Sequence, residues 1–318
     1  MQLVLNELSF PGEGNWVAAN QYMELFLRIY LALREKHPIQ IEKELLSPIL
    51  PREMELVPGF SAFEWVHHAK TDREYGRQFR NLCEHMHCVK PEAEEILCTT
   101  RDNTFGDGLQ IAAELGYPLL SFAFHNACRA SQIPCRIETN ADGTMDAKLA
   151  NFVTEQSVSD NEWWIDERFS REIQSIRTGA ALLDFADKHC PSLILLDFAR
   201  SQIMNRLEFT ALPVVAEKFV MLETYFSAWD GTRFDPDCFP TKSVRPESKE
   251  TLKQFKEEHT FRHNGQNYLV SYHMVYTFKG SGRPGRIYFY PNAEGRKALI
   301  CTVYTKLPCV SYQKFHKK

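Results

Sequence analysis

The chain has 318 residues, enough for about two domains, and 44% of them are hydrophobic while 25% are charged. This composition excludes a wholly disordered or fibrous protein. The formal net charge is only −4, but the charge is unevenly distributed. Residues 241–318 carry 15 Lys and Arg against 5 Asp and Glu, whereas residues 1–240 carry 22 against 36. An acidic body is therefore joined to a strongly basic C-terminal part.

The sequence carries no sign of export or membrane insertion. The first ten residues lack a basic region followed by a long apolar stretch, so no signal peptide is expected. No apolar run approaches the roughly 20 residues that span a bilayer. The 9 Cys are an odd number at irregular spacings. We therefore expect a cytoplasmic protein with reduced thiols and no membrane partner.

The body 1–229 is predicted to be mostly helical, with a few strands. In chain order the expected elements are helices over 16–36, 62–68 and 73–86, a short helix over 106–115, a strand over 119–124, a hairpin with arms 136–139 and 149–153, one helix or a broken pair over 163–187, a strand or buried helix segment over 192–198, and a helix over 212–229. Pro38 is expected to end the first of these helices.

A change of composition follows the last of these helices. Residues 230–246 are rich in Gly and Pro and are predicted to be a linker. The expected elements after it are a helix over 247–258 and strands over 268–278, 286–290 and 297–305. The predicted fold class is therefore α+β, with a mostly helical acidic body (1–229), a linker (230–246) and a small basic module of one helix and an antiparallel sheet (247–318).

Cations and tyrosines are interleaved in the predicted strands of the basic module. Cations neutralise phosphates, and aromatic faces accept unstacked bases. In 286–290, strand alternation places Arg286, Tyr288 and Tyr290 on one face. This favours RNA or DNA as a partner, and the alternative is a solvated sheet face that is merely cationic. The residues expected to bind nucleic acid are Arg262, Lys279, Arg283, Arg296 and Lys297.

The same module contains the residue types of a metal-independent ribonuclease. Cleavage of RNA through its own 2′-OH needs a base, an acid and cations on the scissile phosphate. His273 is the acid–base candidate, Arg286 and Lys306 are the phosphate cations, and Tyr288 is an orienting or stacking residue. The alternative is that these residues only bind or only support the fold. If the protein is an enzyme, we expect an endoribonuclease without a cofactor.

No metal site is predicted. Cys83, His85, His87 and Cys88 are zinc-ligand types, but on a helix Cys83 and His87 share a face that His85 leaves. The sequence contains no phosphate-binding loop, no dinucleotide fingerprint and no nucleophile elbow. Asp197 ends an apolar stretch, but no Glu-x-Lys follows as a metal-dependent nuclease would require.

The chain resembles a family of poorly characterised bacterial proteins found in genomic neighbourhoods of anti-phage defence. The resemblance covers most of the length and is carried by Leu5-Asn6-Glu7-Leu8-Ser9-Phe10, Gly108-Leu109 leading to Leu120-Ser121-Phe122, Glu223-x-Tyr225-Phe226-x-x-Trp229, Phe234-Asp235-Pro236, Glu247-Ser248-x-x-Thr251, Phe261, Gly265, His273, Arg286-Ile287-Tyr288-Phe289 and Leu307-Pro308. The family's C-terminal module is similar to RelE/HigB-type toxins, which are ribosome-associated mRNA interferases. The resemblance therefore implies an RNA-cleaving effector.

This sequence departs from the family pattern near its end. His259 stands where the family has Arg, Cys301 and Tyr304 stand where Gly is expected, and Lys306 stands where the family has His. If that His has a chemical role in the family, Lys306 must take it over here.

Three hypotheses follow. The leading one is a component of a bacterial anti-phage defence system whose basic module engages nucleic acid, as a RelE-like ribonuclease toxin. The alternative is a non-enzymatic adaptor or regulatory subunit whose acidic body binds a partner defence enzyme. The third is an intramolecular clamp, in which the body masks the basic tail. The clamp predicts that a 241–318 fragment binds RNA more tightly than the whole chain at low salt.

Overall fold

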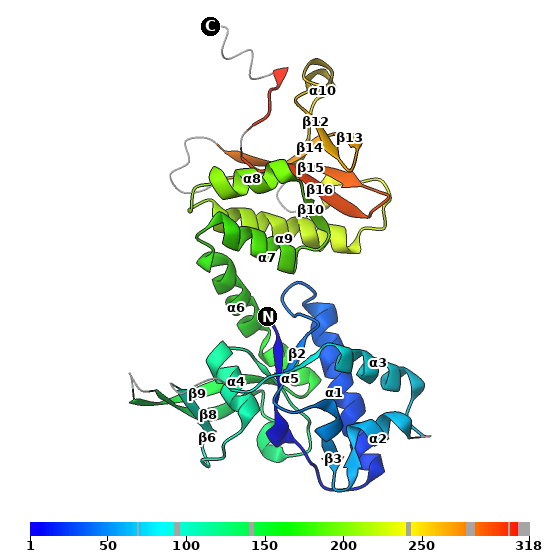
Figure 1. Cartoon of the computed structure of the whole chain (residues 1–318), viewed down its shortest axis with the longest axis vertical. Coiled ribbons are helices and arrows are strands. Elements are labelled where there is room, and N and C mark those ends of the chain that lie inside the picture. Colours follow the sequence, from blue (N-terminus) through cyan, green and yellow to red (C-terminus); the bar gives the residue numbers. More distant parts are fainter. Residues whose placement is uncertain are drawn as a thin grey trace. The chain divides into compact units, whose positions relative to one another are not determined.

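The computed structural model describes residues 1–68, 70–91, 96–139, 143–239, 243–277, 284–304 and 306–310. The chain divides into two compact units, unit 1 (Met1–Phe169) and unit 2 (Ser170–Lys318), as seen in Figure 1. Unit 1 carries 15 Lys and Arg against 26 Asp and Glu, and unit 2 carries 22 against 15. Unit 1 is therefore acidic and unit 2 is basic, although unit 2 also includes residues 170–240 of the acidic part of the sequence.

Unit 1 is built on a seven-stranded sheet with the order β5-β2-β1-β7-β9-β8-β6. Its strands are β1 (Leu3–Leu5), β2 (Leu45–Ser47), β5 (Met86–Cys88), β6 (Ile96–Thr100), β7 (Leu119–Leu120), β8 (Gln132–Thr139) and β9 (Gly143–Phe152). The five strands from β5 to β9 are parallel, and β8 and β6 add an antiparallel edge. The sheet grows outward in both directions from β1 and β7, as in doubly wound α/β folds.

Helices cover both faces of this sheet (Figure 1). The helices of unit 1 are α1 (Trp16–Lys36), α2 (Ala62–His67), α3 (Arg73–Glu84), α4 (Asp107–Leu115), α5 (Glu155–Asp160) and α6 (Glu162–Ser175), the last of which runs across the boundary between the units. Alternation along β1 separates two cores. Leu3 and Leu5 pack in one core with Phe26 of α1, and Val4 packs in the other with Leu109 of α4.

Helix α1 shows why the local sequence predicts its element well. Asn15 caps the helix, because its side chain accepts the N–H of Val17 at 2.9 Å. Apolar residues, among them Phe26 and Leu33, recur on one buried face. The helix ends at Lys36, two residues before Pro38. The predicted helix over 16–36 is confirmed.

Unit 2 contains a five-stranded sheet with the order β10-β16-β15-β14-β11. Its strands are β10 (Leu193–Leu195), β11 (Val244–Pro246), β14 (Tyr272–Tyr276), β15 (Gly285–Asn292) and β16 (Lys297–Thr302). The strands β11, β14, β15 and β16 are antiparallel, and β10 pairs with β16 in parallel. A separate hairpin is formed by β12 (Thr260–His263) and β13 (Gln266–Leu269).

The helices of unit 2 are α7 (Gly179–His189), α8 (Asp197–Asn205), α9 (Leu212–Ala228) and α10 (Lys249–Gln254), with the 3₁₀ turn η4 (Pro236–Cys238). Helix α9 packs on the five-stranded sheet through aromatic contacts. Phe226 of α9 lies 6.0 Å from Phe289 of β15, and Phe234 lies 5.5 Å from the same ring. Aromatic packing thus holds α9 and the segment after it on the sheet.

The predicted domain organisation is corrected by this architecture. The boundary between the two units in the chain follows Phe169 and does not fall at 230–246. The supposed linker belongs to unit 2, because Phe234 and Phe239 are buried and β11 joins the sheet. A 241–318 fragment would also lack β10, which pairs with β16. The fragment experiment of the clamp hypothesis therefore cannot use an intact unit.

Several predicted elements are refined. The chain contains helices and strands, as the α+β prediction requires, but unit 1 is a mainly parallel sheet with helices, not a mostly helical body. The expected strand over 268–278 is split into β13 and β14, and the helix over 163–187 is a broken pair, α6 and α7. No helix in the described ranges is long and apolar enough to cross a membrane.

Candidate acid–base site

Four segments of unit 2 bring together one carboxylate, two histidines, an arginine and a tyrosine. Glu247 follows β11, His259 precedes β12, His273 lies in β14, and Arg286 and Tyr288 lie in β15. His273 is the partner of Tyr288 in the antiparallel ladder of β14 and β15. Arg286 and Tyr288 are two residues apart and share one face of β15. We call these five residues the acid–base cluster.

Glu247 is the centre of the acid–base cluster. Its Oε1 lies 2.9 Å from Nδ1 of His273 and 3.8 Å from Nη1 of Arg286. The side chains of Glu247 and His273 are 8% and 7% exposed, and that of Arg286 is 17% exposed. Burial raises the pKa of Glu247, but hydrogen bonding to His273 and the charges around it outweigh burial and lower that pKa. The site thus holds Glu247 as a carboxylate.

Tyr288 is completely buried within the acid–base cluster. Its hydroxyl oxygen accepts the N–H of Leu307 at 3.1 Å and an Nη1–H of Arg286 at 3.3 Å. Burial raises the pKa of Tyr288 to about 12. The ring lies 5.2 Å from His273. The ring is covered, so the predicted stacking of Tyr288 on an exposed base is wrong, and its orienting role stays a prediction.

His259 is the second imidazole of the acid–base cluster and is fully buried. Its Nδ1 lies 3.3 Å from the carbonyl oxygen of Val270, and its Nε2 lies 3.0 Å from that of Pro308. Carbonyl oxygens only accept hydrogen bonds, so the ring makes both bonds only when both nitrogens carry a proton. His259 also contributes to the lowered pKa of Glu247.

Lys306 is half-buried and begins a segment that is hydrogen-bonded to the acid–base cluster. The following residue, Leu307, donates its N–H to Tyr288, and Pro308 accepts from His259. Val310 donates its N–H to Oγ1 of Thr251 at 3.4 Å. The segment 306–310 is therefore hydrogen-bonded to the cluster and to α10.

The residues predicted to bind nucleic acid do not form one basic face in the described part of the chain. Arg262 is exposed on the β12–β13 hairpin, whereas Arg296 and Lys297 lie at the turn between β15 and β16. The distance along β15 from Arg286 to this turn is about 20 Å, at roughly 3.3 Å per residue. Burial raises the pKa of Glu223 and Lys297 partly opposes it, whereas hydrogen bonds from Thr232, with a smaller contribution from Arg296, lower the pKa of Asp230. Lys279 and Arg283 lie outside the described residues.

A polar network fills the carboxyl ends of the parallel strands in unit 1. Asn6 donates from Nδ2 to Oγ of Ser121 at 2.9 Å, and Ser121 donates to Oδ1 of Asn151 at 2.6 Å. Glu7 accepts the N–H of Gly108 at 2.9 Å, in the first turn of α4. Doubly wound folds bind ligands at this edge, often with a phosphate at a helix N-terminus. Here the carboxylate of Glu7 occupies the N-terminus of α4.

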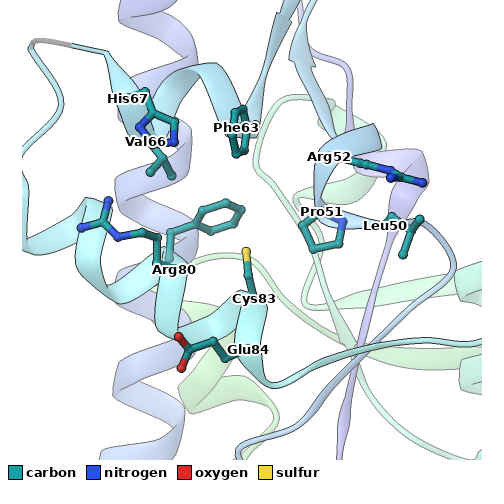
Figure 2. A pocket seen from close by; sticks show the side chains of 10 residues that line it. Leu50, Pro51, Arg52, Phe63, Val66, His67, Arg80, Cys83 and Glu84 are labelled. Atoms are coloured by element: carbon teal, nitrogen blue, oxygen red, sulfur yellow. The ribbon is translucent and has the colours of Figure 1, made fainter.

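Unit 1 also contains a cavity of about 530 Å³ between α2, α3 and the 3₁₀ turn η2 (Pro51–Glu53). Figure 2 shows Cys83 pointing toward its centre, with the guanidinium groups of Arg52 and Arg80 directed outward on opposite sides. Burial raises the pKa of Cys83 to about 11, so the thiol is neutral at pH 7. No three His, Cys, Asp or Glu side chains are arranged to hold a metal in the described ranges. The cavity is therefore apolar at its centre.

Sequence reasoning identified His273, Arg286 and Tyr288, and the structure brings these three together. The sequence predicts a helix that begins at Glu247 and assigns no chemical role to Glu247 or to His259. No local signal marks either residue, because β11 before Glu247 is only three residues long and has no readable periodicity. The chain matches no known family model, no curated protein and no solved structure.

Proposed function

We propose that this protein is a component of a bacterial anti-phage defence system whose unit 2 acts on RNA as a metal-independent endoribonuclease of the RelE/HigB kind. The observation that carries the proposal is the 2.9 Å contact of Glu247 Oε1 with Nδ1 of His273, beside Arg286. A carboxylate on Nδ1 fixes the orientation of an imidazole and leaves Nε2 for proton transfer, as in other acid–base sites. Nonspecific support comes from the net positive charge of unit 2.

The proposed reaction uses the substrate's own 2′-OH. His273 takes the 2′-OH proton at Nε2, the 2′-oxygen forms a bond to phosphorus, and the bond from phosphorus to the 5′-oxygen breaks. The products are a 2′,3′-cyclic phosphate and a 5′-OH, whose proton comes from Lys306 or from water. Arg286 stabilises the charge on the phosphate. Its Nε is buried and has no hydrogen-bond partner among the described residues, so it is a donor that a phosphate oxygen reaches only when the site opens.

Access to the acid–base cluster is the condition for this reaction. His273 and Tyr288 are buried, and the segment 306–310 bonds to Tyr288 and His259. We propose that displacement of this segment opens the site and is the activating step. Leu307→Pro tests the step in the full chain, because proline has no N–H to donate to Tyr288.

The experiment measures cleavage of single-stranded RNA by the Leu307→Pro chain, alone and combined with active-site changes. We expect cleavage above that of the wild type, and a loss of about 100-fold on adding His273→Asn. Asparagine keeps a donor near the place of Nδ1 but cannot shuttle a proton. The control is His263→Asn, in β12 and outside the cluster, which should leave the rate unchanged. Equal rates for both variants, or no cleavage by any of them, would refute the enzymatic proposal.

A second function, an adaptor that binds a partner defence enzyme through unit 1, is favoured by the apolar cavity of Figure 2. Phe63 at its edge is 62% exposed, and burial on a partner would remove this ring from water. Co-purification with the product of the adjacent gene tests this function. Phe63→Asp should abolish it, while Met145→Asp, at another exposed apolar position of unit 1, should not. Equal effects of the two changes would exclude this surface.

A further inference from the structure

A second cavity, of about 560 Å³, lies in unit 2 at the C-terminal end of α9. One side is formed by a face of α9 that includes Tyr225, followed by Trp229 and Asp230. Cys238 and Phe239, at the end of η4, form the other side. The cavity is therefore bounded by three aromatic residues and one carboxylate, and its size is that of a small-molecule site.

The aromatic walls are held by packing before any ligand arrives. Tyr225 and Phe239 lie 4.9 Å apart at an interplanar angle of 30°. The hydroxyl oxygen of Tyr225 accepts the N–H of Asp235 at 3.2 Å, which ties the helix to the segment after it. Trp229 is 9% exposed and packs edge-on against Phe226 at 5.3 Å. These rings lose little freedom when a ligand binds, since the protein core already restrains them.

The charge at this cavity is negative. Asp230 is the one charged residue that lines it among the described residues, and it is exposed. Hydrogen bonds from Thr232, and to a smaller extent Arg296, lower the pKa of Asp230, so it is ionised at neutral pH. Partial desolvation, followed by the hydrogen bond to Asp235 and the charges of Asp235 and Asp237, raises the pKa of the exposed Cys238 thiol. This negative region lies within a unit of net positive charge.

We infer that this cavity is a binding site for a small organic cation with an apolar body, of the alkylated ammonium type. Aromatic faces attract cations through their quadrupole, and the most favourable partners are ammonium groups without tightly bound water. The carboxylate of Asp230 at the rim supplies the complementary charge. An anion or a nucleotide phosphate would meet the carboxylate of Asp230 and, among the described lining residues, no lysine or arginine. This site is separate from the acid–base cluster and does not depend on its activity.

The test measures binding of choline to the full chain by calorimetry and compares it with 3,3-dimethyl-1-butanol, in which carbon replaces the charged nitrogen. We expect choline to bind at least about fivefold more tightly, given the usual strength of cation–π contacts. Asp230→Asn should weaken choline binding about threefold or more, and Phe239→Leu should weaken it similarly. Asp237→Asn is the matched control, because Asp237 is a nearby carboxylate that does not line the cavity.

Three results would overturn the inference. Equal binding of the neutral analogue would show an apolar pocket without cation recognition. Equal weakening by Asp230→Asn and Asp237→Asn would show that choline responds to the overall negative charge of this region and not to a local site. Absence of choline binding, or tighter binding of adenosine than of choline, would exclude the alkylated ammonium class. Melting temperatures of the variants within a few degrees of the wild type confirm that folding is intact.

Discussion

Replacing Glu247 by alanine should strongly destabilise unit 2. The change removes the only acidic partner of His273 and Arg286 in the described acid–base cluster. Because Glu247 and His273 are 8% and 7% exposed, the small energies of surface ion pairs do not apply. Removing one member of a buried pair costs about 3–5 kcal/mol, since the remaining charge stays buried. At about 2–4 °C per kcal/mol for a unit of this size, the melting temperature should fall by about 6–20 °C.

Scanning calorimetry and urea unfolding of the full chain measure this loss. Glu257→Ala, an exposed change near α10, is the control and should stay within about 0.5 kcal/mol of the wild type. Glu247→Gln keeps an acceptor for His273 and should lose only about 1–3 kcal/mol. If Glu247→Ala is no less stable than Glu257→Ala, the acid–base cluster is not a desolvated ion pair and the reasoning fails.

The same pair predicts a dependence of stability on pH. The pKa of Glu247 is lowered in the folded state below its ordinary value of 4.5. The folded state therefore binds this proton less readily than the unfolded state, and the contribution of the carboxylate is fully present above the ordinary value. It is lost as the pH falls through the lowered pKa. The stability difference between the wild type and Glu247→Gln should accordingly be constant from pH 5.5 to 7 and shrink below about pH 4. A difference that grows on acidification would contradict this sign.

Three further substitutions test the packing and hydrogen bonding inside the two units. Gly108→Ala should destabilise unit 1 by about 1–3 kcal/mol, because a Cβ there would lie 2.3 Å from the backbone oxygen of Leu5. Gly76→Ala, in α3 with no atom nearer than 3.8 Å, should instead stabilise by up to about 1 kcal/mol, and thermal unfolding of both distinguishes strain from helix propensity. In unit 2, Gln202→Leu should cost about 1–3 kcal/mol in urea unfolding, because its Oε1 accepts from Oγ1 of Thr302 and from the N–H of Val303. A neutral effect would mean that water replaces the amide there.

The local pattern of the sequence was sufficient where an element is long and its ends are marked. Helix α1 has a cap at Asn15 and a stop at Pro38, so its bounds could be predicted to the residue. The alternation of Arg286 and Tyr288 with Ile287 and Phe289 also survives in β15. In contrast, β1, β2 and β5 each have three residues and belong to the sheet of unit 1. A strand so short has no readable period, and its partners come from distant parts of the chain.

The candidate site divides in the same way. Residue types alone identified His273, Arg286 and Tyr288 as a group, because acid–base chemistry on phosphates needs those functional groups. Only the tertiary structure added Glu247, since β11 pairs with β14 and brings that carboxylate to Nδ1 of His273. Burial was likewise undetermined, because a face of Arg and Tyr is exposed or covered according to what packs on it.

The sequence by itself determined the charge asymmetry, the helical faces and the alternation along β15, because these depend on residue order over short distances. Tertiary structure decided the boundary after Phe169, the membership of β10 in the sheet of unit 2, and the burial of Tyr288. These features depend on pairing between segments far apart in the chain. Such pairing is selected by the total free energy of packing and hydrogen bonding, which no local window of sequence contains.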